Sequence, residues 1–311
     1  MKNAAMTRRS ALKTTLLAAA AANAGIVNLA AEGVHWPLGC FNRPWMQKTD
    51  VTAQPTATPQ PTNWGLDAAL DGMKQAGFRM IGLLTRTKDD PFIGSEATDD
   101  YLAALKQKIA ASGLSANMAA LRVKAGGSVD DGVTDVHKQI NNAQGLDLKW
   151  LLTFGVDDPN QYDTYCKILA DAADYALERH LKLAIKPHGG SSGGSAEILD
   201  CLRKVGRPNF SVWFDAGNII YYTGKDPVEE LKPIAEHVTG FCAKDCDKQN
   251  GDVWLQLGRG KVNFRTVFET LRDGGFVGPI FLECAAGKSC AQINRATAAD
   301  RAFLEKTMAQ L

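Results

Sequence analysis

The stretch LAIKPHGG, residues 183–190, is a short apolar run that ends in a lysine, a histidine and two glycines. Side chains alternate between the two faces of a strand, so Lys186 and His188 share one face while Ile185 and Pro187 share the other. Two ionisable side chains therefore converge at the carboxyl end of a predicted strand. The segments on either side of this stretch decide which kind of sheet contains it.

Short β-rich runs alternate with longer amphipathic runs along the chain in both directions from this stretch. The predicted strands cover residues 37–41, 79–85, 114–123, 148–156, 181–188, 210–216, 238–245 and 279–284. The predicted helices cover residues 63–76, 99–112, 130–143, 161–179, 196–205, 227–237, 263–273 and 291–309. Strands that alternate with helices in this rhythm predict a parallel sheet.

The number and size of the repeats favour a closed sheet. Eight strand–helix pairs over about 275 residues are typical of a (β/α)₈ (TIM) barrel. An open doubly wound sheet is disfavoured because no G-x-G-x-x-G motif follows the first strand. No linker divides residues 31–311, which we predict to be a single α/β barrel domain. The Pro- and Thr-rich segment 52–62 is long for this fold, and we expect a surface loop over the barrel mouth.

The composition is that of an ordinary globular protein. The chain has 311 residues, of which 45% are hydrophobic and 22% charged, and its formal net charge is +1. Such a balance provides no field that would gather nucleic acid or an anionic membrane surface. We therefore expect neither as a partner.

The first residues differ from the rest. Two arginines in TRRSALK, residues 7–13, precede an alanine- and leucine-rich run over 14–22, and small residues follow at 22–24. This pattern predicts an export signal, since the apolar run is too short to span a membrane. The paired arginines resemble a twin-arginine signal over residues 1–30 and imply a periplasmic location. The alternative is an uncleaved amphipathic tail.

Seven cysteines in an exported chain would normally suggest disulfide bonds. Their odd number and irregular spacing weaken that expectation. Twin-arginine cargo folds before export, so the fold should not depend on oxidation. The pair to test first is Cys246 and Cys290, because the predicted topology puts both in neighbouring loops on one face.

In a (β/α)₈ barrel the chemistry is built at the carboxyl ends of the strands. The predicted strand ends supply Lys186 and His188, Asp215 and Asn218, Cys242 and Lys244, and Glu283. Alternation along each strand allows all of these side chains to point into one mouth. The structural alternative is that the two carboxylates only form buried salt bridges with the lysines.

Five segments carry a family resemblance: LAIKPHGG, WFDAGN, CAKD, LGRGKVNF and GPIFLE. In this order and spacing they resemble the xylose-isomerase-like sugar phosphate isomerase/epimerase family of barrels, over nearly all of the domain. That family usually binds one divalent metal through glutamate, aspartate, histidine and glutamate on its fifth to eighth strands. The resemblance assigns the two retained carboxylates to Asp215 and Glu283. Lys186 stands at the position of the first glutamate, and Cys242 at that of the histidine.

These two departures leave two arrangements open. In the first, Asp215, Glu283 and His188 hold Mn²⁺ or Mg²⁺ together with waters, because oxygen-rich sets with an imidazole suit such metals. In the second, no metal is bound, and the ammonium groups of Lys186 and Lys244 stabilise developing negative charge directly. An ammonium group has no lone pair for a cation, which favours the second arrangement.

The resemblance implies a carbohydrate-active isomerase or epimerase that moves a proton next to a carbonyl through an enolate-like intermediate. Glu283 is the preferred general base. Lys186 and Lys244 would act as electrostatic stabilisers or acids, and His188 is the second acid/base candidate.

Other polar and aromatic residues would bind the substrate. Asn218, Tyr222 and Trp254 are the candidates, with the two aromatic rings stacking on a sugar. The glycine- and serine-rich segment 189–194 lacks the ending of a P-loop and is expected to cover the sugar. An extracytoplasmic location favours a free or oxidised saccharide over a sugar phosphate. The oligomeric state stays open.

Three rival functions remain to be compared. A keto-glycoside lyase or hydratase would pass through the same enolate-like state. A non-catalytic sugar-binding barrel would explain the loss of two expected metal ligands. An endonuclease is disfavoured, because it would need several metal-binding histidines and a basic groove.

Overall fold

The structure is a computed structural model that describes residues 34–46 and 64–311. The predicted signal peptide and the predicted mouth loop 52–62 both lie outside the described residues. No helix in the described part of the chain is long and apolar enough to cross a membrane.

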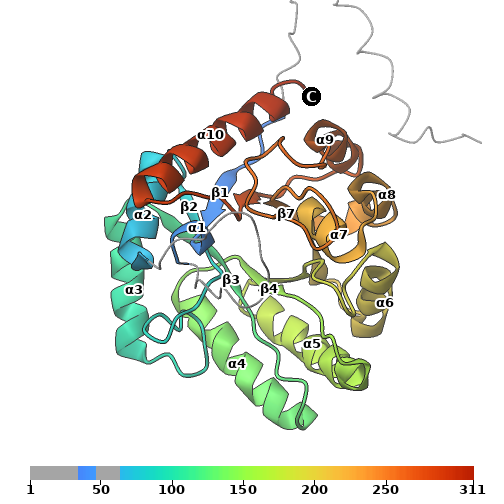
Figure 1. Cartoon of the computed structure of the whole chain (residues 1–311). Coiled ribbons are helices and arrows are strands. Elements are labelled where there is room, and N and C mark those ends of the chain that lie inside the picture. The colour runs from blue at the N-terminus through green and yellow to red at the C-terminus, as the bar shows by residue number, and fades with distance from the viewer. Residues whose placement is uncertain (1–33, 47–63) are drawn as a thin grey trace, which may run out of the picture. The chain divides into compact units, whose positions relative to one another are not determined.

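Eight parallel strands close into a barrel in sequence order, so that β1 pairs with both β2 and β8 (Figure 1). The strands are β1 (Leu38–Phe41), β2 (Met80–Leu83), β3 (Ser115–Ala120), β4 (Trp150–Thr153), β5 (Lys182–Ile185), β6 (Phe210–Asp215), β7 (Val238–Ala243) and β8 (Ile280–Leu282). This confirms the predicted (β/α)₈ barrel and each predicted strand.

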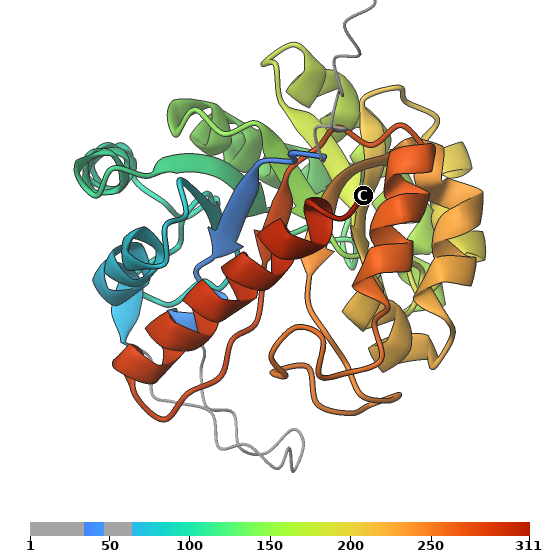
Figure 2. The same cartoon turned by 90° about the horizontal axis from the view of Figure 1, so that it is seen from above.

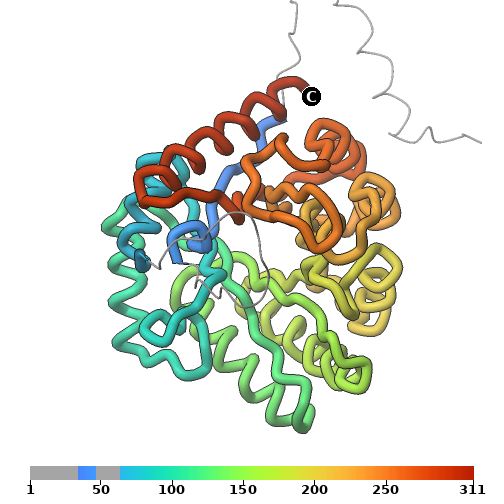
Figure 3. The backbone as a smooth tube through the Cα atoms, viewed as in Figure 1, coloured from blue at the N-terminus to red at the C-terminus, as the bar shows by residue number. Residues whose placement is uncertain are grey.

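The helices form a ring around the barrel (Figure 3). They are α1 (Arg43–Met46), α2 (Gly65–Gln75), α3 (Asp99–Ala111), α4 (Val129–Gly145), α5 (Tyr162–Leu177), α6 (Ser195–Val205), α7 (Ala216–Thr223), α8 (Pro227–Leu231), α9 (Phe264–Asp273) and α10 (Cys290–Met308). Two 3₁₀ helices, η1 (Pro159–Gln161) and η2 (Lys232–His237), precede α5 and follow α8. In Figure 2 the arrow of β1 points to the end of the barrel where the long loop between β7 and α9 lies.

Local differences from the sequence prediction have clear physical causes. The helix predicted over 227–237 is split into α8 and η2 around Pro233, which has no N–H for a helical hydrogen bond. Helix α7 is not predicted, because WFDAGN reads as a strand end and a turn. Asp215 ends β6 and also begins α7, where its carboxylate accepts a hydrogen bond from the backbone of Asn218.

The barrel interior is filled by large rings opposite small residues. Gly240 in β7 faces the indole of Trp213, and Gly39 in β1 faces the ring of Phe281, so a Cβ at either glycine would collide with the ring. The interior cluster consists of Phe41, Leu84, Met118, Ala120, Leu152, Ala184, Trp213, Cys242 and Phe281. A larger apolar cluster joins the outer face of the barrel to the helices. The barrel is therefore a packed core, and only its mouth is available for ligands.

Cys246 and Cys290, the pair to test first for a disulfide, are not joined, because all seven cysteines are free thiols in the structure. The thiol of Cys246 donates to the carbonyl of Lys248 at 3.1 Å, whereas that of Cys290 faces Oδ1 of Asn294 at 3.8 Å. The two thiols are thus bonded within different segments. The fold stands without a cross-link.

Candidate active site

Four charged side chains meet where strands β5 to β8 end. Lys186 directly follows β5, Asp215 is the last residue of β6, Lys244 directly follows β7, and Glu283 directly follows β8. Each is at most 2% exposed. Buried charged groups of this kind are retained only when they are paired or hydrogen-bonded.

The four groups form a closed ion-pair network. The ammonium of Lys186 lies 2.8 Å from Oδ2 of Asp215 and also contacts Oε2 of Glu283. The ammonium of Lys244 lies 3.0 Å from the same Asp215 oxygen and 3.3 Å from Oε1 of Glu283. Each lysine thus bridges both carboxylates.

Arg43 is a fifth charged member that was not among the predicted site residues. Its guanidinium contacts Oε1 of Glu283 and lies over the ring of Trp254, 4.9 Å from the ring centre. It begins α1, two residues after the end of β1, and applying the strand-end rule to the first strand would have found it. Trp254 is only 5% exposed and is covered on this side by Arg43. It therefore supports the arginine rather than offering that face to a sugar.

The charges fix the protonation states of this network. Burial alone would raise the pKa of Glu283, but the positive charges of Lys186, Lys244 and Arg43 outweigh it and hold that pKa well below its usual value. Burial would lower the pKa of each lysine, whereas Asp215 and Glu283 raise both above the usual value. At neutral pH three cations therefore surround an ionised Glu283.

Asn218 joins the ends of two neighbouring strands. Its backbone N–H donates to Oδ1 of Asp215 at 2.8 Å, and its side-chain amide donates to the carbonyl of Pro187 at 2.6 Å. The residue is 3% exposed. The structure therefore places Asn218 behind Asp215, where it holds β5 and β6 in register, and not on the wall of the mouth.

His188 lies on the wall of the mouth rather than at its floor. Pro187 has no N–H to continue the ladder, so β5 ends at Ile185, and the backbone N–H of His188 donates to Ser192 in a turn. Oη of Tyr222 is 3.0 Å from Nε2 of His188. Although the side chain is accessible, desolvation among its neighbours and the charges of Lys186 and Lys244 lower the pKa of His188 to about 4. The imidazole is neutral at pH 7.

A cavity of about 430 Å³ opens above this network. Its lining residues are Arg43, Leu84, Thr85, Arg86, Arg122, Phe154, Lys186, His188 and Glu283. They come from the ends of β1 to β5 and of β8. The volume lies within the roughly 300–1,000 Å³ of small-molecule sites, and we name this space the mouth cavity.

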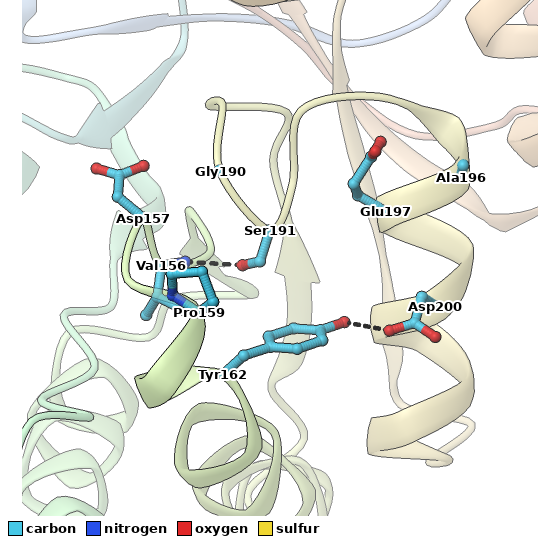
Figure 4. Close-up of a pocket in the computed structure, with 9 residues that line it drawn as sticks. All are labelled: Val156, Asp157, Pro159, Tyr162, Gly190, Ser191, Ala196, Glu197 and Asp200. Atoms are coloured by element: carbon cyan, nitrogen blue, oxygen red, sulfur yellow. Dashed lines mark hydrogen bonds between the residues drawn. The ribbon is translucent and has the colours of Figure 1, made fainter.

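A second cavity of about 550 Å³ lies beside the barrel, between the loops that precede α5 and α6 (Figure 4). Several of its polar groups are engaged within the protein: Tyr162 donates to Asp200 at 2.9 Å, and the Oγ of Ser191 accepts from the backbone of Val156 at 2.9 Å. None of the charged network lines it. We therefore assign the chemistry to the mouth cavity.

Asp215, Cys242 and Glu283 are buried residues whose ligand atoms all lie within 4.8 Å of one another, a spacing that could hold a metal ion. Cys242, rather than the predicted His188, completes this set. Its thiol donates to Oε2 of Glu283 at 2.8 Å, and burial, together with the two carboxylates, raises the pKa of that thiol well above its usual value. A metal bound here would therefore have to displace the thiol proton of Cys242, since the thiolate is the ligand form.

The state of the lysines decides whether a divalent ion fits this set. The Asp215 oxygen that faces the centre is already in contact with two ammonium groups, and Glu283 contacts two ammonium groups and a guanidinium. An added divalent cation would meet three positive charges, and the described residues add no further acid to this set. With Lys186 and Lys244 protonated, the residues present do not fit the metal.

The fold and the site together define a closed (β/α)₈ barrel with a buried, fully paired charge cluster at the carboxyl ends of its strands. The chain belongs to the family of xylose isomerase-like TIM barrels, whose model matches residues 70–307. An uncharacterised protein of Methanocaldococcus jannaschii is 25% identical over 126 residues, which span 40% of this chain and 42% of that protein. The match therefore spans less than half the length of that relative.

Solved structures share the fold at low sequence identity. A xylose isomerase domain protein from Planctomyces limnophilus is 17% identical with a TM-score of 0.64, and the match covers 88% of this chain and 96% of that one. A xylose isomerase-like barrel from Mycobacterium smegmatis in complex with magnesium is 16% identical with a TM-score of 0.68, covering 88% and 97%. A D-psicose 3-epimerase with D-tagatose from Clostridium cellulolyticum is 12% identical with a TM-score of 0.67, covering 88% and 99%.

Proposed function

We propose that this protein is an exported sugar isomerase or epimerase that removes a proton next to a carbonyl and uses ammonium groups, in place of a metal, to stabilise the enolate. The observation that carries the proposal is the buried network in which Lys186 and Lys244 each bridge Asp215 and Glu283. Family membership and the sugar epimerases among the structural neighbours support the substrate class.

The reaction begins with a carbonyl oxygen beside Lys186. Glu283 takes the proton from the adjacent carbon, the C–H electron pair becomes the C=C bond of an enolate, and the charge moves to the oxygen. Preorganised cations in a water-poor site stabilise that charge far better than water does. Returning the proton to the other face of the same carbon inverts that carbon. If that carbon carries a hydroxyl, the proton can instead return to the former carbonyl carbon while the hydroxyl proton passes to the first oxygen, so that the C=O bond forms at the neighbouring carbon and the carbonyl moves.

Glu283 is a weak base in the resting site because three cations hold its charge. A substrate oxygen that draws Lys186 toward itself weakens this hold, and the pKa of the carboxyl then rises as the enolate forms. Inversion needs a second group on the opposite side of the carbon. His188, paired with Tyr222 on the wall of the mouth cavity, is the candidate.

Proton exchange with solvent tests the proposal even when the products are unidentified. The purified protein is incubated in ²H₂O with a panel of ketoses and 3-keto-glycosides, with and without chelator, and deuterium at the carbon next to the carbonyl is followed by NMR. We expect exchange that survives the chelator and that is lost in Glu283→Gln. Loss of exchange on chelation would contradict the metal-free mechanism, and release of a substituent from the sugar would identify a lyase. Binding without exchange in every case would refute the enzyme and favour a sugar-binding barrel.

A further inference from the structure

The side of the mouth cavity next to β2 and β3 carries two arginines. Arg86 lies three residues beyond the end of β2, and Arg122 two residues beyond the end of β3. Both line the cavity together with Arg43 and Lys186, whereas the lining contains a single acidic residue, Glu283. The cavity is therefore rich in positive charge.

The acids near this cavity are already engaged by other cations. Glu283 is in contact with Lys186, Lys244 and Arg43. Arg86 is paired with Glu96, whose side chain is 59% exposed. No carboxylate of the described residues forms an ion pair with the other arginine.

Arg122 is this remaining cation. Within residues 34–46 and 64–311 no acid lies at ion-pair distance from its guanidinium, which packs over the ring of Phe154, 5.1 Å from the ring centre. Its backbone N–H and carbonyl are both bonded to the side chain of Gln139, which fixes the start of the side chain. The guanidinium is thus anchored and supported, but no carboxylate among the described residues accepts from its N–H donors.

The two guanidinium groups also act on each other. Partial burial and the charge of Arg86 both lower the pKa of Arg122. Like charges that face one cavity repel unless an anion lies between them. A guanidinium presents a planar fork of donors that matches a carboxylate or a phosphate through two parallel hydrogen bonds.

We infer that the substrate is an anionic saccharide whose oxyanion binds Arg122, with Arg86 beside it, while its carbonyl lies against Lys186 and Glu283. This inference rests on the proposed function for the position of the carbonyl. The oxyanion would be the carboxylate of an oxidised sugar or the phosphate of a sugar ester, since both share the chemistry that a guanidinium recognises.

Equilibrium binding measured by calorimetry at low salt tests the inference independently of turnover. The probes are D-glucuronate, D-galacturonate and D-glucose 6-phosphate, each compared with its neutral counterpart, D-glucose or D-galactose. The variant is Arg122→Gln. The control is Arg203→Gln, which removes the same charge from an exposed residue of α6 that pairs with Asp200. Circular dichroism and a melting curve check that both variants are folded.

We expect at least one acid to bind more tightly than its neutral counterpart. Arg122→Gln should lower the affinity for that acid by about 10-fold to 100-fold, the usual loss for a hydrogen bond to a charged group. Affinity for the neutral sugars and the behaviour of Arg203→Gln should match the unaltered protein. A preference limited to the phosphate ester would identify the source of the oxyanion.

Two results would overturn the inference: no acid preferred over its neutral counterpart, or equal acid affinity in Arg122→Gln and Arg203→Gln. Arg122→Lys, which keeps the charge but loses the fork, should recover only part of the affinity. Acid binding that depends on Arg122, in a protein that exchanges no proton, would support this inference and refute the proposed function. The two ideas can therefore fail separately.

Discussion

Lys186 is the residue on which the proposed mechanism depends. Its ammonium lies between two carboxylates that would otherwise repel each other in a buried site. A divalent ion commonly has this role in metal-dependent sites, where it neutralises carboxylates and a developing enolate together. An ammonium supplies one charge and three donors, without the open coordination positions of a metal. The second lysine and Arg43 provide the remaining charge.

Removing the Lys186 ammonium should destabilise the fold strongly. In Lys186→Met the two buried carboxylates lose a shared partner, and loss of one partner of a buried ion pair costs about 3–5 kcal/mol of unfolding free energy. The control Lys232→Met breaks an exposed pair with Glu229 and should cost less than about 1 kcal/mol. Urea unfolding followed by circular dichroism measures both. Equal midpoints for the two variants would contradict a stabilising role for the network.

His188 predicts a pH dependence of stability whose sign follows from its low pKa. The folded pKa of about 4 lies below the ordinary value of about 6.5, so the unfolded chain binds the proton more readily. The contribution of His188 is therefore fully present above about pH 6.5 and is lost as the pH falls toward 4. His188→Gln should remove this part of the slope. Denaturant midpoints of both proteins between pH 4 and 7.5 test it, and superimposable curves would contradict the assignment.

At the scale of the elements, packing inside the barrel matches small residues to large rings. β7 brings Gly240 against Trp213 of β6, and the register between these strands shifts at this point. The barrel interior leaves no space for a side chain at this position, because Trp213 is fully buried and surrounded by other core residues. This packed layer lies directly below Asp215 and Cys242 and fixes the strands that carry them.

Gly240→Ala should therefore destabilise the barrel. The added methyl forces the indole of Trp213 or the backbone of β7 to move, and such overpacking costs about 1–3 kcal/mol. Gly127→Ala is the matched control, since a Cβ at Gly127 meets no atom within 4 Å. Its stability should stay within about 0.5 kcal/mol of the unaltered protein. Urea unfolding distinguishes the two, and a neutral Gly240→Ala would show that β7 can shift freely.

Local sequence pattern is sufficient to predict the elements and part of the site. Alternation of short and long runs places every strand, and the strand ends select Lys186, Asp215, Lys244 and Glu283. The same pattern is insufficient where the backbone departs from a regular strand. The alternation rule stops at Ile185, so the positions of Lys186 and His188 relative to each other depend on the turn that follows Pro187.

At the scale of the whole molecule, the site exists only because the barrel closes. Arg43 contacts Glu283 across 240 residues of sequence, and pairing of β1 with β8 brings them together. Lys186 and Glu283 are separated by 97 residues. A strand-end rule applied to β1 would select Arg43 as a residue of the mouth, but nothing in a local pattern reports that its partner is Glu283. Which cation contacts which carboxylate in the network is likewise determined by the closed sheet.

The predicted export signal acts on the whole folded chain. A barrel whose site requires closure of β1 on β8, and whose seven cysteines are free thiols, has no disulfide whose formation outside the cell would complete the site. A pathway that carries folded cargo suits such a protein, and the paired Arg8 and Arg9 are the predicted recognition element.

The double substitution of Arg8 and Arg9 by lysine tests this prediction, because it keeps the charge and removes the paired guanidinium groups. It should leave the protein inside the cell, as measured by fractionation and immunoblotting. The same exchange at Arg203 and Arg207, both on the exposed surface of the barrel, should leave export unchanged. If both doubly substituted proteins were exported equally, the arginines would not be the signal, and the preference for an extracytoplasmic saccharide would lose its support.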